Sequence, residues 1–364
     1  MAYRIAVLPG DGIGPDVMAE ALKVLGAVQA AFPGLALQCQ EYKAGARCYR
    51  ETGTDLPPET MAACRTADAV LFGSGGLPDV RFEDGTEIAP QLTLRTTLDL
   101  YAGVRPIKRY SGVPPALAGD PPIDYVILRE NTEGLYASRG GGIQVGNQVA
   151  TDGMVITRAG TERIVRYAFR LAQKRRGAPG DGARRVTCVD KANVLKSMAF
   201  FRRVFDDVAR EFHDVAADHV YVDAMTVRMV QRPQRLDVVV AENMFGDILS
   251  DLGAATVGGM GLAPSADVGD AHGLFQPSHG TAPDIAGKGI VNPIAQLLSA
   301  AMMLDWLGDR HGDNRARAAG RAIEAAVAKA LADPTCHTAD LGGRASTVAV
   351  GDAIAATVRE TGRE

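Results

Sequence analysis

The chain has 364 residues, of which 46% are hydrophobic, 23% charged and 5% aromatic. This length and composition predict two domains with ample buried core and exclude a disordered or fibrous chain. Lys and Arg number 39 against 43 Asp and Glu, so the net charge of −4 offers no broad positive field and nucleic acid is not an expected partner. No apolar run approaches the ~20 residues that span a bilayer, so no membrane association is expected.

Cysteine usage and the start of the chain predict a cytoplasmic protein. The five cysteines are odd in number, widely spaced and without a CxxC pair. Such spacing is typical of a reducing compartment and argues against a disulfide framework or a zinc site. The first residues lead directly into a strand-like segment instead of the apolar core of a signal peptide.

Short apolar runs alternate with helical patterns along the chain. The predicted strands are Ile5–Leu8, Ala69–Phe72, Tyr125–Leu128, Val186–Val189 and Val238–Val240. The predicted helices are Asp16–Ala30, Thr161–Lys174, Ala199–Glu211, Pro293–Leu307 and Ala318–Ala332. This alternation indicates an α/β fold. The glycine-rich segment Arg139–Asn147 favours a projecting hairpin arm.

A glycine loop, Gly10–Pro15, lies between the first predicted strand and helix, where a dinucleotide-binding loop would lie. The GxGxxG fingerprint requires glycine where Pro15 stands, so the motif is incomplete. Pro15 is better explained as the beginning of the helix, with the glycines forming a tight turn. No GxxxxGK[ST] motif and no phosphate-binding lysine follow the loop, which argues against a nucleotide kinase.

Two carboxylates, Asp247 and Asp251, are four residues apart and would share one helix face. A solvated acidic face is one explanation, but a divalent cation with oxygen ligands would relieve their repulsion. Asp223, at a predicted strand end, is a candidate third ligand. Three acids suit Mg²⁺ or Mn²⁺.

Three arginines and a Lys/Tyr pair complete the candidate site. Arg95, Arg105 and Arg129 are individually ordinary, but together their planar guanidinium groups would select a di- or tricarboxylate. Lys191 follows a buried-looking strand, where desolvation or a metal would lower its pKa enough for proton transfer. Tyr136 is a candidate for the complementary acid.

Together these segments closely resemble the β-decarboxylating dehydrogenases, which include isocitrate, homoisocitrate, 3-isopropylmalate and tartrate/D-malate dehydrogenases. The resemblance covers nearly the whole chain and is carried by six motifs in family order: residues 10–15, 94–106, 129–136, 190–194, 242–251 and 279–293.

The resemblance implies a two-domain α/β fold with a mixed sheet flanked by helices, which is not a Rossmann fold. Residues 1–100 plus 258–364 would form the cofactor-side domain. Residues 101–257 would form an inserted dimerisation and substrate domain, with a clasp arm near 137–155. The family is typically homodimeric with shared active sites, and Lys191 and Asp223 would enter the site of the neighbouring subunit.

The resemblance also assigns roles. Arg95, Arg105 and Arg129 match residues that hold the substrate carboxylates, and Asp223, Asp247 and Asp251 match the ligands of Mg²⁺ or Mn²⁺, with Asp223 also beside the substrate. Lys191 would help to remove the hydroxyl proton during hydride transfer, and Tyr136 would protonate C3 after CO₂ leaves. Activation by K⁺ is left open.

NAD is the expected cofactor, because Asp284 matches the acid that accepts ribose hydroxyls and would repel a 2′-phosphate. The residues that the resemblance assigns to cofactor binding are Ile13, Asn193, His279, Gly280, Ala282, Asp284, Ile285 and Asn292.

The segment before Arg95 sets the substrate in this family, and here it departs from two patterns. Gln91 stands where isopropylmalate enzymes present leucine, and Ala89 where isocitrate enzymes present serine. A buried amide against an isopropyl group would cost about 1–3 kcal/mol, so a small or polar C3 substituent, as in D-malate or tartrate, is favoured. The alternatives are 3-isopropylmalate, homoisocitrate and isocitrate. Gln276 also replaces a usual glutamate near the nicotinamide ribose, and Gly103 a common asparagine.

A catalytically silent regulatory subunit is the alternative from another class. Such subunits usually lack metal aspartates or the catalytic pair. Here Tyr136, Lys191, Asp223, Asp247 and Asp251 are all present, which favours an active enzyme acting on a small hydroxy diacid.

Overall fold

The computed structural model describes residues 2–139 and 141–361, which form two compact units. Unit 1 combines Met1–Leu98, Tyr110–Pro114 and Gly258–Glu364, and unit 2 combines Asp99–Arg109 and Pro115–Val257. Residues 1 and 362–364 of the predicted cofactor-side domain, and Gly140 of the predicted arm, lie outside the described residues.

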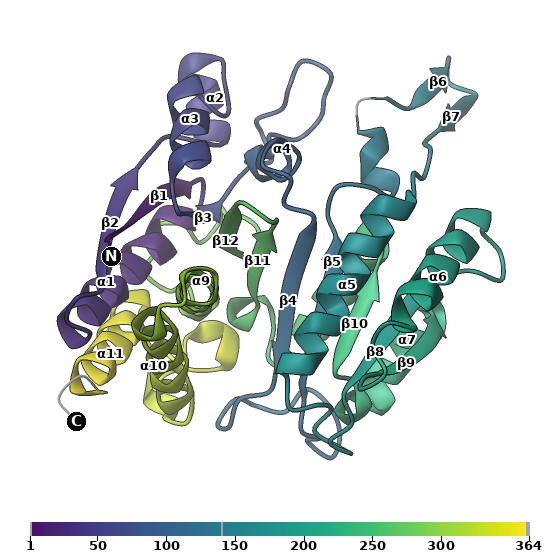
Figure 1. Ribbon diagram of the computed structural model, residues 1–364. Coiled ribbons are helices and arrows are strands. Elements are labelled where there is room, and N and C mark those ends of the chain that lie inside the picture. Colours follow the sequence, from purple (N-terminus) through teal and green to yellow (C-terminus); the bar gives the residue numbers. More distant parts are fainter. Residues whose placement is uncertain (1, 140, 362–364) are drawn as a thin grey trace. The chain divides into compact units, whose positions relative to one another are not determined.

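Unit 1 contains a mixed sheet in the order β2-β1-β3-β12-β11 (Figure 1). Strands β1, β2, β3 and β12 pair in parallel, and β11 pairs with β12 antiparallel. The bounds are β1 Ala2–Gly10, β2 Ala36–Glu41, β3 Ala69–Ser74, β11 Pro264–Val268 and β12 Gly273–Pro277. All residues of β3, β11 and β12 are buried, which is typical of strands covered on both faces.

Long helices pack against each other and on this sheet (Figure 1). Helix α9 contacts β3, β11 and β12, and its Leu297, Leu304 and Leu307 are fully buried. Helix α1 packs on α11 and α9, and α10 packs on α9. The bounds are α1 Gly14–Ala31, α2 Ala46–Thr52, α3 Pro58–Thr66, α4 Pro90–Thr97, α9 Ile294–His311, α10 Asn314–Leu331 and α11 Thr347–Thr361.

Unit 2 contains a second run of strands in the order β4-β5-β10-β8-β9. Strands β5, β10, β8 and β9 pair in parallel, and β4 pairs with β5 antiparallel. The bounds are β4 Ala102–Lys108, β5 Asp124–Glu130, β8 Arg185–Asp190, β9 Ala216–Tyr221 and β10 Val238–Ala241. The sequence Val-Val-Val-Ala makes β10 a fully buried central strand.

Four helices cover these strands: α5 packs with α6, and α7 packs with α8. Their bounds are α5 Arg158–Lys174, α6 Lys196–Ala209, α7 Val222–Gln231 and α8 Asn243–Thr256. Strands β6 Ile143–Val145 and β7 Val149–Thr151 form an exposed antiparallel hairpin that projects from unit 2 (Figure 1). Short 3₁₀ turns occur at Leu135–Ser138, Pro233–Arg235, Met260–Leu262, Pro334–Cys336 and Ala339–Leu341.

The predicted α/β class with mixed pairing is confirmed. The five predicted strands lie within β1, β3, β5, β8 and β10, and the five predicted helices correspond to α1, α5, α6, α9 and α10. Helix α6 ends at Ala209, two residues before the predicted end. Among the described residues, none of the helices is both long and apolar enough to cross a membrane.

Candidate active site

One face of α8 carries three polar side chains at helical spacing. Asn243, Asp247 and Asp251 follow each other at intervals of four residues and therefore stack along the helix. Partial burial raises the pKa of Asp251, and the negative charge of Asp247 raises it further. Burial and the neighbouring carboxylate therefore both disfavour the charged form of Asp251.

Arg129 and Tyr136 contact the central carboxylate of this face. The buried Arg129, at the end of β5, forms an ion pair with Asp247 and donates from Nε and Nη2 to Asn243 Oδ1 at 2.9 and 2.8 Å. Tyr136 donates its hydroxyl proton to Asp247 Oδ2 at 2.8 Å, and its ring centroid lies 5.1 Å from the Arg129 guanidinium. Partial burial and the Asp247 carboxylate raise the pKa of Tyr136, so the phenol stays protonated.

Arg105, in β4, belongs to the same neighbourhood. Its side chain is buried, and its positive charge lowers the pKa of Asp251, as does that of Arg129. Unit 2 therefore brings together five predicted residues: Arg105, Arg129, Tyr136, Asp247 and Asp251.

Lys191 and Asp223 form a separate pair in unit 2. Lys191 follows β8, Asp223 lies in the first turn of α7, and Lys191 Nζ donates to Asp223 Oδ1 at 2.6 Å. This hydrogen bond lowers the pKa of Asp223. Both side chains are solvent-accessible, at 26% and 67%, so the pair is available to a ligand.

A buried ion pair supports the turn that carries Lys191. Asp190, which is fully buried at the end of β8, accepts two hydrogen bonds of 2.7 Å from Arg202 and one of 2.8 Å from the backbone N–H of Ala192. The Tyr221 ring lies 5.0 Å from the Arg202 guanidinium and 5.8 Å from Lys191 Nζ. Arg202 and Tyr221 thus connect Lys191 to the beginning of α7.

The three predicted metal ligands are not gathered within one chain. Among the described residues, no group of three or more His, Cys, Asp or Glu side chains could hold a metal ion. Asp247 and Asp251 offer two hard oxygen ligands, which suit Mg²⁺ or Mn²⁺. Asp223 lies apart, with Lys191.

Unit 1 holds Arg95 and Gln91, both on α4. Arg95 is buried and donates from Nε to Asp267 Oδ2 at 2.9 Å. Gln91 is half-buried, and its Oε1 atom is shielded from solvent without a hydrogen-bond partner among the described residues. The ideal Cβ position of Gly75 is 3.1 Å from this oxygen, so the Gln91 amide packs tightly against the β3 end.

The glycine loop is held by a buried acid that the sequence analysis did not single out. Asp11 accepts hydrogen bonds from the backbone N–H groups of Ala46, Arg47 and Gly76 at 2.6, 2.8 and 2.9 Å. A Cβ atom on Gly12, with φ of +56°, would collide with the Thr281 carbonyl. The glycines therefore allow close packing of this loop on the segment after β12.

The predicted cofactor residues in unit 1 surround that contact. Ile13 donates its N–H to the Thr281 carbonyl at 2.8 Å and packs with Val17 and Val291, against which Ala282 and Ile285 also pack. Gly280 and Asp284 are exposed.

Three further predicted cofactor residues differ in their surroundings. Burial lowers the pKa of His279, so the ring is neutral, and its Nε2 atom is shielded without a partner among the described residues. Asn292 is buried and already bonded, donating to Asp340 Oδ2 and accepting from the Ile294 N–H, both at 3.0 Å. Asn193 is exposed and belongs to unit 2, whereas the other predicted cofactor residues belong to unit 1.

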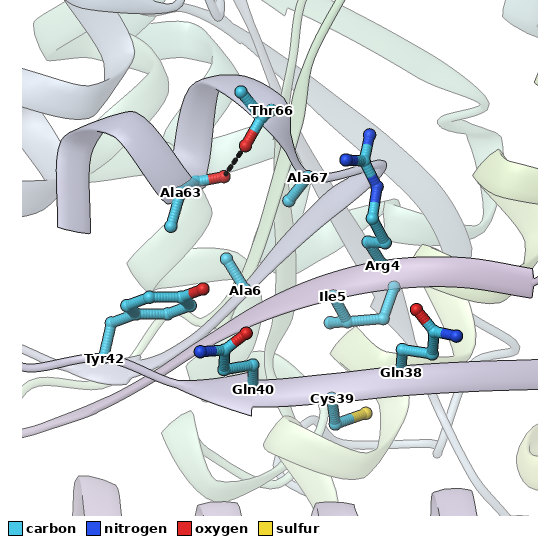
Figure 2. Close-up of a pocket in the computed structure, with 10 residues that line it drawn as sticks. All are labelled: Arg4, Ile5, Ala6, Gln38, Cys39, Gln40, Tyr42, Ala63, Thr66 and Ala67. Carbon is cyan, nitrogen blue, oxygen red and sulfur yellow. Dashed lines mark hydrogen bonds between the residues drawn. The ribbon is translucent and has the colours of Figure 1, made fainter. Parts of the chain in front are cut away.

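A hollow of about 490 Å³ in unit 1 lies between α3 and strands β1 and β2 (Figure 2). Figure 2 shows Arg4, Gln38 and Gln40 among its lining residues. None of the ten residues drawn there is a predicted site residue, and we assign the hollow no catalytic role.

Asn243, Asp267 and Asp11 were not predicted from the sequence. Asn243 could have been found, because it precedes Asp247 by the same four residues that separate Asp247 from Asp251. Asp267 is 172 positions from its partner Arg95 along the chain, so no local spacing signals the contact.

The chain is similar to known proteins over nearly its whole length. Residues 4–354 match the family model described as isocitrate/isopropylmalate dehydrogenase. A "3-isopropylmalate/3-methylmalate dehydrogenase" from Methanocaldococcus jannaschii is 44% identical over 98% of this chain and 99% of its own length. A "3-isopropylmalate dehydrogenase" from Rhodococcus jostii is 45% identical over 94% of this chain and 98% of its own length.

Solved structures show the same relationship. An isocitrate dehydrogenase from Methylococcus capsulatus is 38% identical, with a TM-score of 0.85 and coverage of 98% of this chain and 99% of the other. A β-decarboxylating dehydrogenase from Thermococcus kodakarensis is 40% identical, with a TM-score of 0.78, 98% of this chain and 96% of the other being covered.

These matches define the class as decarboxylating dehydrogenases, which are oxidoreductases. The chain belongs to the isocitrate/isopropylmalate dehydrogenase family.

Proposed function

We propose that the enzyme carries out the NAD- and divalent-metal-dependent oxidative decarboxylation of a 3-alkylmalate, with 3-isopropylmalate as the preferred substrate. The observation that carries the proposal is the cluster on α8, where Arg129 and Tyr136 both contact Asp247. This cluster combines an anion-binding group, a proton donor and a cation ligand.

The carboxylates fit a divalent cation. Asp247 and Asp251 supply hard oxygen donors four residues apart on α8, and burial together with the Asp247 charge raises the pKa of Asp251. His279 fits a cofactor contact, because its shielded Nε2 has no partner among the described residues. When bound, the cation would polarise the 2-hydroxyl and stabilise negative charge on its oxygen, and NAD would accept the hydride from C2.

The arginines hold the diacid. Arg105 and Arg129, which are buried in unit 2, and Arg95, which is buried in unit 1, present planar donors that suit carboxylates. Their burial fixes their orientation and limits water around them, so a bound carboxylate would be well ordered.

Lys191 and Tyr136 handle the protons. Lys191 Nζ, which Asp223 positions through a hydrogen bond, receives the 2-hydroxyl proton as the hydride leaves C2. After the β-carboxylate leaves as CO₂, C3 requires a proton. Tyr136, a phenol whose pKa is raised further by burial and by Asp247, supplies that proton from its hydroxyl.

The choice of 3-isopropylmalate departs from the small or polar substituent that Gln91 favours in the sequence. The relatives from Nocardia farcinica and Rhodococcus jostii are named 3-isopropylmalate dehydrogenases and are 44% and 45% identical. The Methanocaldococcus jannaschii relative is also named for 3-methylmalate. These names support a 3-alkylmalate over D-malate, tartrate or homoisocitrate.

A small polar substrate is the second candidate, and one observation favours it. The shielded Gln91 Oε1 has no hydrogen-bond partner within the described residues. A hydroxyl substituent, as in tartrate, could donate to this oxygen, whereas an isopropyl group could not.

We further propose that the enzyme acts as a homodimer with shared active sites. Exposed apolar side chains occur on α7, α8 and the β6–β7 hairpin of unit 2. On α7 and α8, Val227, Val230 and Ile248 are about half exposed, at 51%, 47% and 55%. A second copy would cover these side chains and bring its Lys191 and Asp223 to Tyr136, Asp247 and Asp251. The cytoplasmic location and K⁺ activation stay predictions.

The test is NADH formation and CO₂ release from 3-isopropylmalate, with Mn²⁺ or Mg²⁺ and either NAD or NADP. We expect one NADH per CO₂, loss of both products with EDTA, recovery on adding Mn²⁺, and preference for NAD. Absence of turnover with every hydroxy diacid tried would support a silent subunit instead.

A further inference from the structure

Arg95 is held by a buried acid to which the sequence analysis assigned no role. Asp267, in β11, is fully buried and accepts the Arg95 Nε hydrogen at 2.9 Å, and the Arg95 side chain is only 6% exposed. Within the described part of the chain, this is the single hydrogen bond found for the Arg95 guanidinium. The bond fixes the Nε edge and leaves the terminal nitrogens for a ligand.

Gln276, on the neighbouring strand β12, contacts the same carboxylate oxygen. In the antiparallel pair, Gln276 lies opposite Ser265, two residues before Asp267, so both side chains point to the same face of the sheet. Gln276 Nε2 is 3.5 Å from Asp267 Oδ2, and Gln276 is itself buried. A glutamate at position 276 would place a second carboxylate beside Asp267, and repulsion at that separation would disfavour the charged form of both carboxylates.

We propose that Asp267 is a positioning residue for Arg95, and that Gln276 is the neutral partner that Asp267 requires. The inference rests on the proposed function, in which Arg95 binds a carboxylate of the substrate. It gives a physical reason for the glutamine at position 276. Asp267 on β11 supplies the buried carboxylate that orients Arg95. Residue 276 on β12 therefore need not be acidic.

The test is a double-mutant cycle of Asp267→Asn, Gln276→Glu and the exchange variant that carries both changes. We expect each single variant to lower kcat/KM for the hydroxy diacid at least tenfold, with the Kd for Mn²⁺ changed less than twofold. The exchange variant again has one carboxylate and one amide, so its kcat/KM should return to within about threefold of the wild-type value. If a single variant does not fold, recovery of folding in the exchange variant carries the same meaning.

The matched control is Asp237→Asn in unit 2. Asp237 is also fully buried and accepts an Arg175 Nε hydrogen at 2.8 Å, but no role in binding is proposed for it. It should lower the melting temperature without changing the KM for the diacid. The inference would be overturned if the two single variants lost stability without a change in KM, as the control should. It would also be overturned if the loss of kcat/KM in the exchange variant equalled the product of the losses in the two single variants. If the wild-type enzyme turned over no hydroxy diacid, the proposed function would be refuted instead. The melting temperatures of the variants would then still measure the coupling between Asp267 and Gln276.

Discussion

The hydroxyl of Tyr136 donates a hydrogen bond to the carboxylate of Asp247, so the proposed proton donor and a proposed cation ligand are in direct contact. Lys191 and Asp223 repeat this relationship elsewhere in unit 2. Each proposed proton-transfer residue is therefore hydrogen-bonded to a carboxylate that is also a proposed cation ligand. Metal binding and proton transfer should depend on each other.

Replacing Asp247 with asparagine should weaken Mn²⁺ binding and lower kcat by about 100-fold or more, because one anionic ligand and the acceptor for Tyr136 are both altered. Titration of Mn²⁺ by electron paramagnetic resonance measures the first effect without turnover. Asp214→Asn, an exposed acid in the same unit, is the control and should leave both values unchanged. Wild-type Mn²⁺ affinity in Asp247→Asn would contradict the assignment.

Mixed dimers test whether Lys191 and Tyr136 from different subunits form one site. Lys191→Ala and Tyr136→Phe should each be inactive as homodimers, since a proton-transfer group is missing. When the two are unfolded together in equal amounts and refolded, half of the dimers are hybrids, and each hybrid has one intact site. About a quarter of wild-type activity should return. No recovery, with hybrid formation verified by differently tagged chains, would show that both residues act in the same subunit.

The apolar side chains of α7 and α8 should be required for dimerisation. Val230→Glu places a charge on this surface, and burying that charge against a second copy would be unfavourable. Light scattering should show monomers, with activity lost in parallel. Val348→Glu on α11 is the control, because Val348 is similarly exposed at 52% but lies in unit 1. A dimeric, fully active Val230→Glu variant would place the interface elsewhere.

Asp284 should determine the preference for NAD. Asp284→Lys replaces an exposed negative charge with a positive one and should raise the ratio of kcat/KM for NADP to that for NAD at least tenfold. Glu59→Lys, an exposed acid on α3, makes the same charge change at a site without a predicted ligand. The NADP to NAD ratio of kcat/KM in Asp284→Lys would contradict the assignment if it equalled the ratio in Glu59→Lys. The adenosine ribose would then contact residues other than Asp284.

The sequence predicted elements whose signal is local. Val238–Val240 and Asp16–Ala30 carry clear strand and helix patterns, and both elements are present. The four-residue spacing of Asp247 and Asp251 correctly indicated a shared helix face. The pairing of Arg95 with Asp267 and the hydrogen bond of Tyr136 to Asp247 connect residues more than 100 positions apart. Only the fold brings such residues together, so their spacing in the sequence carries no signal.

Substrate choice shows the same limit. In the sequence, Gln91 stands where isopropylmalate enzymes present leucine, and this polar side chain favours a small or polar C3 substituent. The structure adds that its Oε1 is shielded and that the amide packs against Gly75. The preference depends on what else surrounds the C3 substituent, which one side chain does not determine.

The most direct test of the proposed function is kcat/KM for 3-isopropylmalate, 3-methylmalate, D-malate and tartrate, measured by NADH formation with Mn²⁺. We predict that 3-isopropylmalate exceeds D-malate and tartrate by at least tenfold, with no NADH formed after EDTA treatment. A tenfold preference for tartrate or D-malate would contradict this prediction and identify Gln91 as the partner of a polar substituent.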